Sequence, residues 1–180
     1  MKVLISGGCK NGKSGFAQEL AVKLSGNGAR YYVATMIPYD GEDRARIEKH
    51  IADRAGMGFE TLEIGTDIAR CLENGRNGTF LIDSVTALLT NETFSAEHGW
   101  KPDAEAPMRC RNGLQEIAER AENAVFVTDY LYSDAARYDE VTEQFRRGLA
   151  LIDRSLAAVC DTVIELCAGN VIFHKGGWTL

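Results

Sequence analysis

A short stretch near the N-terminus, from Ser6 to Ser14, has the residue types and spacing needed to bind a phosphate group. It matches G-x-x-x-x-G-K-[ST], with the residues Gly7, Gly8, Cys9, Lys10, Asn11, Gly12, Lys13 and Ser14. The glycines let backbone N–H groups surround a phosphate, the lysine reaches the β- and γ-phosphates, and the serine hydroxyl can bind Mg²⁺. An apolar run precedes the loop and a helical pattern follows it, as the motif requires. The sequence therefore predicts a nucleotide-binding loop rather than a glycine-rich turn with a chance lysine.

An acidic residue, Asp83, closes the apolar run 79–82. Carboxyl ends of parallel strands face the ligand crevice, so a carboxylate there can hold Mg²⁺ beside Ser14, directly or through water. The alternative is that Asp83 caps the helix that follows, a role that Ser84 could fill instead. We expect Ser14 and Asp83 to be the Mg²⁺ ligands.

A charged segment predicts a helix that carries a histidine between two arginines. Arg46, His50 and Arg54 are four residues apart and so share one helix face. Two guanidinium groups disfavour protonation of the imidazole and attract a phosphate. A neutral imidazole can attack phosphorus and form a covalent intermediate. A solvated basic face explains the same pattern, so the segment alone leaves both interpretations open.

Strand and helix patterns alternate along the chain. Short apolar runs bounded by turn residues predict strands, and longer periodic segments predict helices. The expected strands are 2–6, 31–35, 59–64, 79–83 and 124–128, followed by a β-hairpin of 161–167 and 170–174 that turns at Ala168-Gly169. The expected helices are 13–24, 42–54, 67–73 with Thr66 as its cap, 85–94, 109–122 and 135–159, with an irregular segment at 95–107. This predicts an α/β fold, a mainly parallel central sheet flanked by helices, in a single P-loop domain spanning 1–180.

Composition disfavours several classes of function. The 180 residues carry a formal net charge of -6 and no Lys/Arg-rich tract, which argues against a nucleic-acid partner. The five cysteines form no C-x-x-C pair, which suits reduced thiols and a cytoplasmic location. Neither a signal peptide nor an apolar run long enough for a membrane span is found. His98 and His174 have no partner pattern and are expected to be structural.

Together these segments resemble the adenosylcobinamide kinase / adenosylcobinamide-phosphate guanylyltransferase family of cobalamin assembly. The resemblance covers most of the chain. Besides the phosphate loop, it rests on Tyr32-Val33-Ala34-Thr35, Arg46-Ile47-Glu48-Lys49-His50 with Arg54, Thr61-Leu62-Glu63, and Leu81-Ile82-Asp83-Ser84 with Leu89-Thr90-Asn91. The R-I-x-x-H segment soon after an A-T strand is more specific than the loop, and it favours His50 as a nucleophile.

The resemblance implies a bifunctional enzyme with a RecA-like sheet that forms a homotrimer. One activity phosphorylates the aminopropanol hydroxyl of the corrinoid adenosylcobinamide with ATP or GTP. The other transfers GMP from GTP to that phosphate through a guanylylated histidine, which by position is His50, with Lys13 and Asp83 as the other catalytic candidates. Beyond the phosphate loop, the implied nucleotide contacts are Ala34, Thr35, Met36, Ile51, Ala52, Asp53, Arg54, Glu63 and Asp83.

The later part of the chain departs from the family pattern. The family usually has T-N-E-V-G after its later strand, where this chain has Thr128-Asp129-Tyr130-Leu131-Tyr132. Asp153 also stands where an asparagine is usual, although Phe145-Arg146 fits. These changes bear on corrinoid recognition more than on nucleotide binding. Two alternatives therefore stay open: a divergent kinase acting on another small hydroxylated acceptor, and a nucleotide-binding regulatory protein with little turnover.

Overall fold

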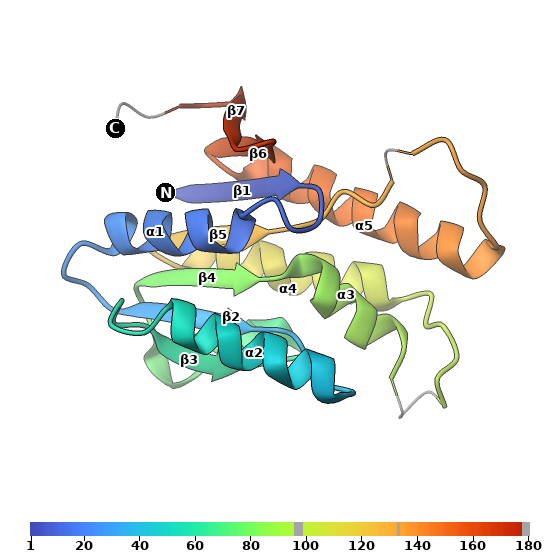
Figure 1. Cartoon of the computed structure of the whole chain (residues 1–180), viewed down its shortest axis with the longest axis horizontal. Coiled ribbons are helices and arrows are strands. Elements are labelled where there is room, and N and C mark those ends of the chain that lie inside the picture. The colour runs from blue at the N-terminus through green and yellow to red at the C-terminus, as the bar shows by residue number, and fades with distance from the viewer. Residues whose placement is uncertain (96–98, 133, 178–180) are drawn as a thin grey trace.

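A seven-stranded sheet forms the centre of the molecule (Figure 1). The computed structural model describes residues 1–95, 99–132 and 134–177, without the side chains of Glu42, Arg46 and Asn74; the expectation for His98 lies outside this description. The strands are β1 (Lys2–Gly7), β2 (Arg30–Ala34), β3 (Glu60–Glu63), β4 (Thr79–Asp83), β5 (Asn123–Val127), β6 (Thr162–Cys167) and β7 (Asn170–Lys175).

The strands follow the order β3-β2-β4-β5-β1-β6-β7. All neighbouring pairs are parallel except β6 and β7, which form the C-terminal antiparallel hairpin. At its turn Ala168 and Gly169 both have positive φ, 49° and 78°. The predicted mainly parallel sheet and the hairpin are confirmed.

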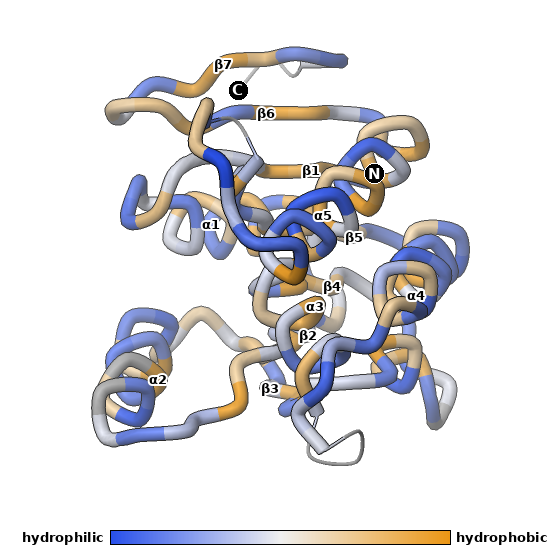
Figure 2. The backbone as a smooth tube through the Cα atoms, turned by 90° about the vertical axis from the view of Figure 1, so that its right-hand side faces the viewer, coloured by the Kyte–Doolittle hydropathy of each residue, from blue (hydrophilic) through white to orange (hydrophobic). Residues whose placement is uncertain are grey.

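Helices cover both faces of this sheet. They are α1 (Lys13–Ser25), α2 (Gly41–Asp53), α3 (Val85–Thr93), α4 (Ala106–Arg120) and α5 (Glu140–Val159), with the 3₁₀ helix η1 at Ile68–Gly75. Figure 2 shows α1 and α2 on one side of the sheet and α4 and α5 on the other. The C-terminal ends of β1, β2, β4 and β5 therefore open onto an edge that helices flank from both sides.

Side-chain alternation along the strands divides the core in two. In β1, Val3 and Ile5 pack with Leu20 of α1, whereas Leu4 packs with the cluster that contains Leu149 and Ile152 of α5. Strand β5 is buried along its whole length, as expected for a strand covered on both faces. Continuous apolar runs such as 124–127 are the sequence signature of this arrangement.

The long helix α5 begins later than the sequence predicted, at Glu140 rather than at residue 135. The side chain of Asp139 accepts a hydrogen bond of 2.9 Å from the Thr142 backbone N–H, which fixes Asp139 as the N-cap. The expectation failed because residues 135–139 contain no glycine or proline that would mark them as non-helical.

Two other helix boundaries also differ from expectation. The segment after Thr66 forms a 3₁₀ helix, and its N-cap position is taken by Asp67 at φ 49°, without a side-chain capping bond. Helix α4 begins at Ala106, within the segment expected to be irregular, with Pro107 in its first turn. A proline there costs little because the first N–H groups of a helix lack intrahelical partners.

Candidate active site

The loop between β1 and α1 has the shape of a phosphate cradle. Lys10 and Gly12 have φ values of 58° and 81°, so the chain turns twice through the left-handed region before α1 begins. A Cβ on Gly7 would lie 2.6 Å from the carbonyl oxygen of Leu166, so the approach of the loop to β6 requires glycine. The Asn11 side chain donates to the same oxygen at 3.3 Å. The N-terminus of α1 adds its free N–H groups to this anion-binding loop.

Lys13 is the first residue of α1, and its side chain has two partners at the loop. Its Nζ donates to the Gly8 carbonyl oxygen at 2.7 Å and lies 2.7 Å from Oδ1 of Asp129. The side chain of Lys13 is 7% exposed and that of Asp129 is 26% exposed. The Asp129 backbone N–H donates to Oγ1 of Thr86 at 3.0 Å, which fixes Asp129 two residues after the end of β5. The two bonds hold the ammonium group at the loop, where the phosphates of a nucleotide bind in such motifs.

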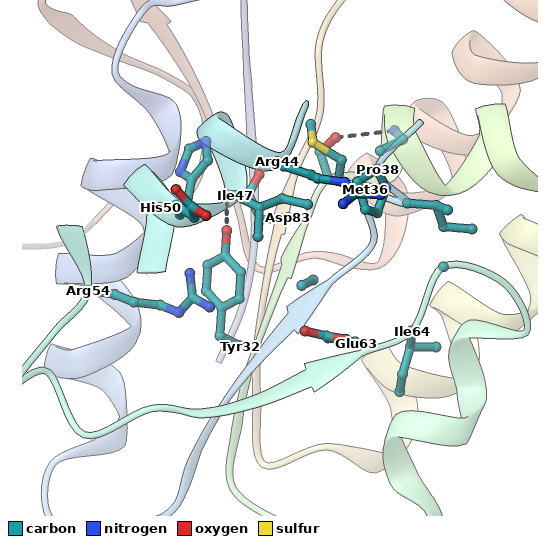
Figure 3. A pocket seen from close by; sticks show the side chains of 16 residues that line it. Tyr32, Met36, Pro38, Arg44, Ile47, His50, Arg54, Glu63, Ile64 and Asp83 are labelled. Atoms are coloured by element: carbon teal, nitrogen blue, oxygen red, sulfur yellow. Dashed lines mark hydrogen bonds between the residues drawn. The ribbon is translucent and has the colours of Figure 1, made fainter. Parts of the chain in front are cut away.

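A pocket of about 480 Å³ lies between α2 and the carboxyl ends of β2, β3 and β4 (Figure 3). It brings together several residues predicted from sequence, namely Ala34, Met36, His50, Arg54, Glu63 and Asp83. Arg44 and Glu48 of α2 also line it, and sequence reasoning did not single out their side chains. The pocket therefore joins an imidazole, two guanidinium groups and carboxylates under one helix.

Tyr32 organises the polar wall of this pocket. Its hydroxyl donates to Oδ2 of Asp83 at 2.8 Å, and the guanidinium of Arg54 lies 4.2 Å from its ring centroid (Figure 3). Burial and the neighbouring Asp83 carboxylate raise the pKa of the Tyr32 hydroxyl well above its usual range, so it stays a donor. Arg54 also donates to Oγ1 of Thr61 at 3.1 Å. In the sequence, Tyr32 stood out only as part of the family-like segment Tyr32-Val33-Ala34-Thr35, and no pattern indicated this role.

His50 is half-buried and faces the same pocket from α2 (Figure 3). Within the described residues, no hydrogen bond or ion pair engages its ring. Of its expected neighbours, Arg54 lies in the wall of the pocket, and the side chain of Arg46 is outside the description. The imidazole is thus positioned at the pocket without a described partner that would hold one of its nitrogens.

The other predicted nucleotide contacts lie apart from this pocket. Ile51, Ala52 and Asp53 are exposed on α2 and do not line it. Thr35 is fully buried, and its Oγ1 accepts from the Ser84 N–H at 2.7 Å, which ties the end of β2 to the end of β4. Cys9 is exposed in the phosphate loop.

Ser84, not Asp83, caps the helix that follows β4. Its side chain accepts a hydrogen bond from the Ala87 N–H at 3.2 Å at the start of α3. The carboxylate of Asp83 is therefore left to face the pocket together with the Tyr32 hydroxyl. This outcome removes the main alternative to the predicted metal role of Asp83.

Two departures from the family pattern touch each other. Tyr132 donates to Oδ2 of Asp153 at 2.9 Å, and Thr128 donates to the same oxygen at 3.2 Å. Asp153 is 5% exposed, and its burial raises the pKa of its carboxyl to about 6. The tyrosine and the aspartate thus form one hydrogen-bonded unit between the loop after β5 and α5.

A pair formed by a histidine and a glutamate lines the same hollow as this unit. Nε2 of His174 lies 2.9 Å from Oε2 of Glu165 on the C-terminal hairpin. A hydrogen bond from His174 lowers the pKa of the Glu165 carboxyl. His174 therefore has an acidic partner that the sequence did not indicate.

The strand order explains why the site forms where it does. Strand β5 lies between β1 and β4, so Asp129 after β5 stands between the phosphate loop after β1 and Asp83 at the end of β4. A parallel sheet presents all these strand ends at one edge. The fold and this loop define the class: a P-loop nucleotide-binding protein with a RecA-like sheet.

Solved structures support this class at the level of the fold. An ATPase from the type III secretion system of pathogenic bacteria matches with a TM-score of 0.55 at 15% identity, covering 93% of this chain and 51% of that one. A further ATPase domain matches with a TM-score of 0.56 at 13% identity, covering 97% and 76%. The flagellar accessory protein FlaH from Methanocaldococcus jannaschii matches with a TM-score of 0.50 at 13% identity, covering 98% and 78%.

A family model identifies the chain more closely. The model described as cobinamide kinase / cobinamide phosphate guanyltransferase matches residues 3–173, nearly the whole chain. The chain therefore belongs to this family, which is a family of enzymes of cobalamin biosynthesis. A comparison with curated proteins found no match. The resemblance inferred from the loop, the histidine helix and the acid at the end of the strand is confirmed.

Two kinds of feature are absent from the described part of the chain. Among the residues described, no helix combines the length and the apolar character needed to cross a membrane. Nor do the described residues gather three or more His, Cys, Asp or Glu side chains into a group that could hold a metal ion.

Proposed function

We propose that this chain phosphorylates the aminopropanol hydroxyl of adenosylcobinamide with ATP or GTP, and then transfers GMP from GTP to that phosphate through a guanylylated His50. The observation that carries the proposal is the position of His50, which shares one pocket with Asp83, Arg44 and Arg54 at the edge of the sheet that holds the phosphate loop. A simple kinase has no need of a histidine there.

The guanylyl transfer has two chemical steps at His50. A ring nitrogen attacks the α-phosphorus of GTP, the new P–N bond forms, and the bond to the bridging oxygen breaks so that pyrophosphate leaves. An oxygen of the acceptor phosphate then attacks the same phosphorus, and the P–N bond breaks. Arg44 and Arg54 line the pocket and can balance negative charge in both steps.

The residues present fit a magnesium ion bound together with the nucleotide. Ser14 and Asp83 offer a hydroxyl and a carboxylate, and Mg²⁺ prefers a few such oxygens combined with phosphate oxygens and waters. When bound, the ion neutralises charge on the phosphates during transfer. Lys13, at the start of α1, supplies a second positive charge beside the loop.

A larger hollow beside the His50 pocket offers room for the acceptor. It has a volume of about 780 Å³, shares Ile37 with the pocket and is lined by Tyr39, Phe94 and Trp100. The rings of Tyr39 and Trp100 lie 6.1 Å apart, and both side chains are exposed. We place the apolar edge of the corrinoid against these rings, because large aromatic side chains bind such surfaces well.

A second candidate function is a kinase for another small hydroxylated acceptor. The observation that favours it is the Tyr132–Asp153 unit, in which two departures from the family pattern bond to each other. Tyr132 and Asp153 line a separate hollow that also contains Ser6, next to the phosphate loop, and the change leaves Lys13, Ser14 and Asp83 in place.

Covalent labelling tests the proposal directly. The protein is incubated with Mg²⁺ and GTP labelled at the α-phosphate, then denatured, and the label retained on the chain is counted. Wild type should retain an acid-labile label that is absent when the γ-phosphate is labelled instead. His50→Ala should lose it, whereas the matched control His174→Ala, which removes an exposed histidine of the hairpin, should keep it. Nucleotide binding without any label would leave the second candidate.

We further propose that residues 1–180 act as one P-loop domain in a homotrimer of the cytoplasm. The resemblance to the family supports the trimer, and the single continuous sheet supports the domain assignment. Light scattering at several protein concentrations gives the molar mass in solution, and a mass of one chain at all of them would contradict the trimer.

A further inference from the structure

A buried tyrosine on β2 touches two groups of opposite charge in the wall of the His50 pocket. Tyr32 is 4% exposed and lines the pocket. Its hydroxyl donates to Oδ2 of Asp83 at 2.8 Å, and the Arg54 guanidinium lies 4.2 Å from its ring centroid (Figure 3). One side chain thus holds a carboxylate through its hydroxyl and a guanidinium through its ring.

We propose that Tyr32 is a positioning residue for both reactions, an inference that rests on the proposed function. Its hydroxyl orients the Asp83 carboxylate for the magnesium ion that accompanies the nucleotide. Its ring holds Arg54 where the guanidinium can meet the phosphate that His50 attacks. Tyr32 acts through these two groups, and no bond of either reaction forms or breaks on it. The two roles belong to different parts of one side chain, so substitutions can separate them.

The role of the hydroxyl follows from the geometry at the ends of two paired strands. Tyr32 lies on β2 two residues before Ala34, which pairs with Asp83 of β4. The bond from the hydroxyl engages Oδ2 and restrains rotation of the carboxylate. Mg²⁺ requires near-ideal octahedral geometry, and loss of a group that orients a metal ligand typically costs roughly ten- to a hundredfold in metal affinity or activity. The hydroxyl therefore matters for metal binding without being a ligand.

The role of the ring follows from how the pocket holds Arg54. This residue is 8% exposed and is the C-cap of α2, one helical turn after His50. It donates to Oγ1 of Thr61 on β3 at 3.1 Å, so the Tyr32 ring and the Thr61 hydroxyl restrain the guanidinium from two strands. An edge contact with Phe59, 6.1 Å between ring centroids, supports the tyrosine ring. A charge that is already in place needs no reorganisation when the reaction occurs.

A tyrosine at a buried strand position can also serve packing alone. The neighbouring Tyr31 points to the opposite face of β2 and stacks on Phe80, with 4.8 Å between the ring centroids. Tyr31→Phe removes a hydroxyl from the same strand outside the pocket and is therefore the matched control. Packing alone predicts the same loss in every assay, whereas positioning predicts losses that differ between assays.

The test compares Tyr32→Phe, Tyr32→Leu and Tyr31→Phe with wild type on the full chain. Tyr32→Phe keeps the ring beside Arg54 and removes only the hydroxyl, whereas Tyr32→Leu removes both. Three quantities are measured against Mg²⁺ concentration: the rate of γ-phosphate transfer from labelled ATP to cobinamide, the rate at which the chain gains label from α-labelled GTP, and the calorimetric affinity for a non-hydrolysable ATP analogue. Urea denaturation verifies that each variant is folded.

We expect Tyr32→Phe to raise the Mg²⁺ concentration that gives half the maximal rate of both reactions by roughly tenfold or more, with little change in the rate at saturating Mg²⁺. The affinity for the analogue should fall by a similar factor in Mg²⁺ and should equal that of wild type in a chelator. Tyr31→Phe should match wild type throughout. A Mg²⁺ requirement of Tyr32→Phe within about twofold of wild type would overturn the role of the hydroxyl.

Tyr32→Leu should show the same Mg²⁺ effect and, at saturating Mg²⁺, gain label about fivefold or more slowly while γ-phosphate transfer recovers. A double-mutant cycle with Arg54→Met then tests whether the ring acts through Arg54. If it does, the double variant should gain label no more slowly than Arg54→Met alone. Additive losses in the cycle would refute the role of the ring and leave packing in its place.

Failure of the proposed function gives a different pattern. Wild type then phosphorylates no cobinamide and gains no label, and calorimetry decides the inference. A Mg²⁺-dependent loss of affinity in Tyr32→Phe but not in Tyr31→Phe would still support the role of the hydroxyl, and equal affinities would refute it. A larger loss in Tyr32→Leu than in Tyr32→Phe would support the role of the ring, because the guanidinium attracts the phosphates of the analogue, and equal losses would refute it.

Discussion

Replacing Asp153 by asparagine should change how the free energy of unfolding depends on pH. Asp153 of α5 is 5% exposed, and within the described residues its Oδ1 has no hydrogen-bond partner. Burial raises the pKa of the carboxyl from 3.8 to about 6, although the hydrogen bonds from Tyr132 and Thr128 to Oδ2 oppose the rise. The folded protein therefore holds the ionised carboxylate at a cost.

The size and sign of that cost follow from the two pKa values. Between pH 3.8 and about 6 the folded state binds more protons at Asp153 than the unfolded state does, so this group lowers the free energy of unfolding as the pH rises. The penalty is absent well below the lower pKa and complete above the higher one, where it amounts to about 3 kcal/mol. Roughly a third of it is already present at about pH 4.5.

Urea denaturation of wild type and Asp153→Asn at several pH values measures this effect. Asparagine does not ionise, so the stability of the variant relative to wild type should rise by about 2 kcal/mol between about pH 4.5 and about pH 7.5. Tyr132→Phe keeps the carboxyl but removes one bond to it, which raises the pKa of Asp153 further and gives a change of the opposite sign. A stability difference between Asp153→Asn and wild type that is independent of pH would refute the reasoning.

The other predictions concern the loop and the helices around it. Lys13→Ala should lower both proposed activities at least about a hundredfold, measured as γ-phosphate transfer and as α-label retention; equal turnover would contradict the role of the loop. Gly7→Ala should lower the free energy of unfolding by about 1–3 kcal/mol in urea denaturation, because the new Cβ would lie 2.6 Å from the Leu166 carbonyl oxygen. Ser84→Ala should cost about 1 kcal/mol in the same assay, because the Ala87 N–H loses its cap; no loss would show that water replaces it. The amides of α2 should exchange with deuterium faster than those of α1, since no described residue of α2 is buried, whereas α1 buries a face against the sheet; mass spectrometry of peptides from both helices checks this.

Much of the fold follows from local patterns in the sequence. The signals for the strand 79–83 and for the loop from Gly7 to Ser14 are each complete within a few residues, and both predicted elements formed where expected. The boundary of α5 was missed because a single side chain, that of Asp139, decides it through a bond to Thr142. Because residues 135–139 contain no glycine or proline, the sequence leaves several positions at which the helix could begin, and it does not say which residue is the cap.

The contacts that matter most in the site could not be predicted from sequence. Lys13 and Asp129 are far apart in the chain, and they meet because β5 lies next to β1. Tyr32 and Asp83 meet because β2 pairs with β4. Both contacts depend on strand order, which local periodicity does not encode. The class of site was therefore predictable, whereas the partner of each charged group was not.

The difference in packing between α1 and α2 bears on how one loop could serve two reactions. Phosphoryl transfer needs an acceptor at the γ-phosphate, whereas guanylyl transfer needs His50 at the α-phosphate, so one fixed arrangement of nucleotide and helix does not suit both. The phosphate loop is anchored by α1, which buries one face, and by the close approach of Gly7 to β6. Helix α2 buries none of its described residues and stands over a pocket of about 480 Å³. An element with so little buried surface moves at small cost. The chain thus combines a fixed site for the phosphates with a histidine on its least firmly packed helix, which is the combination that the two proposed reactions require.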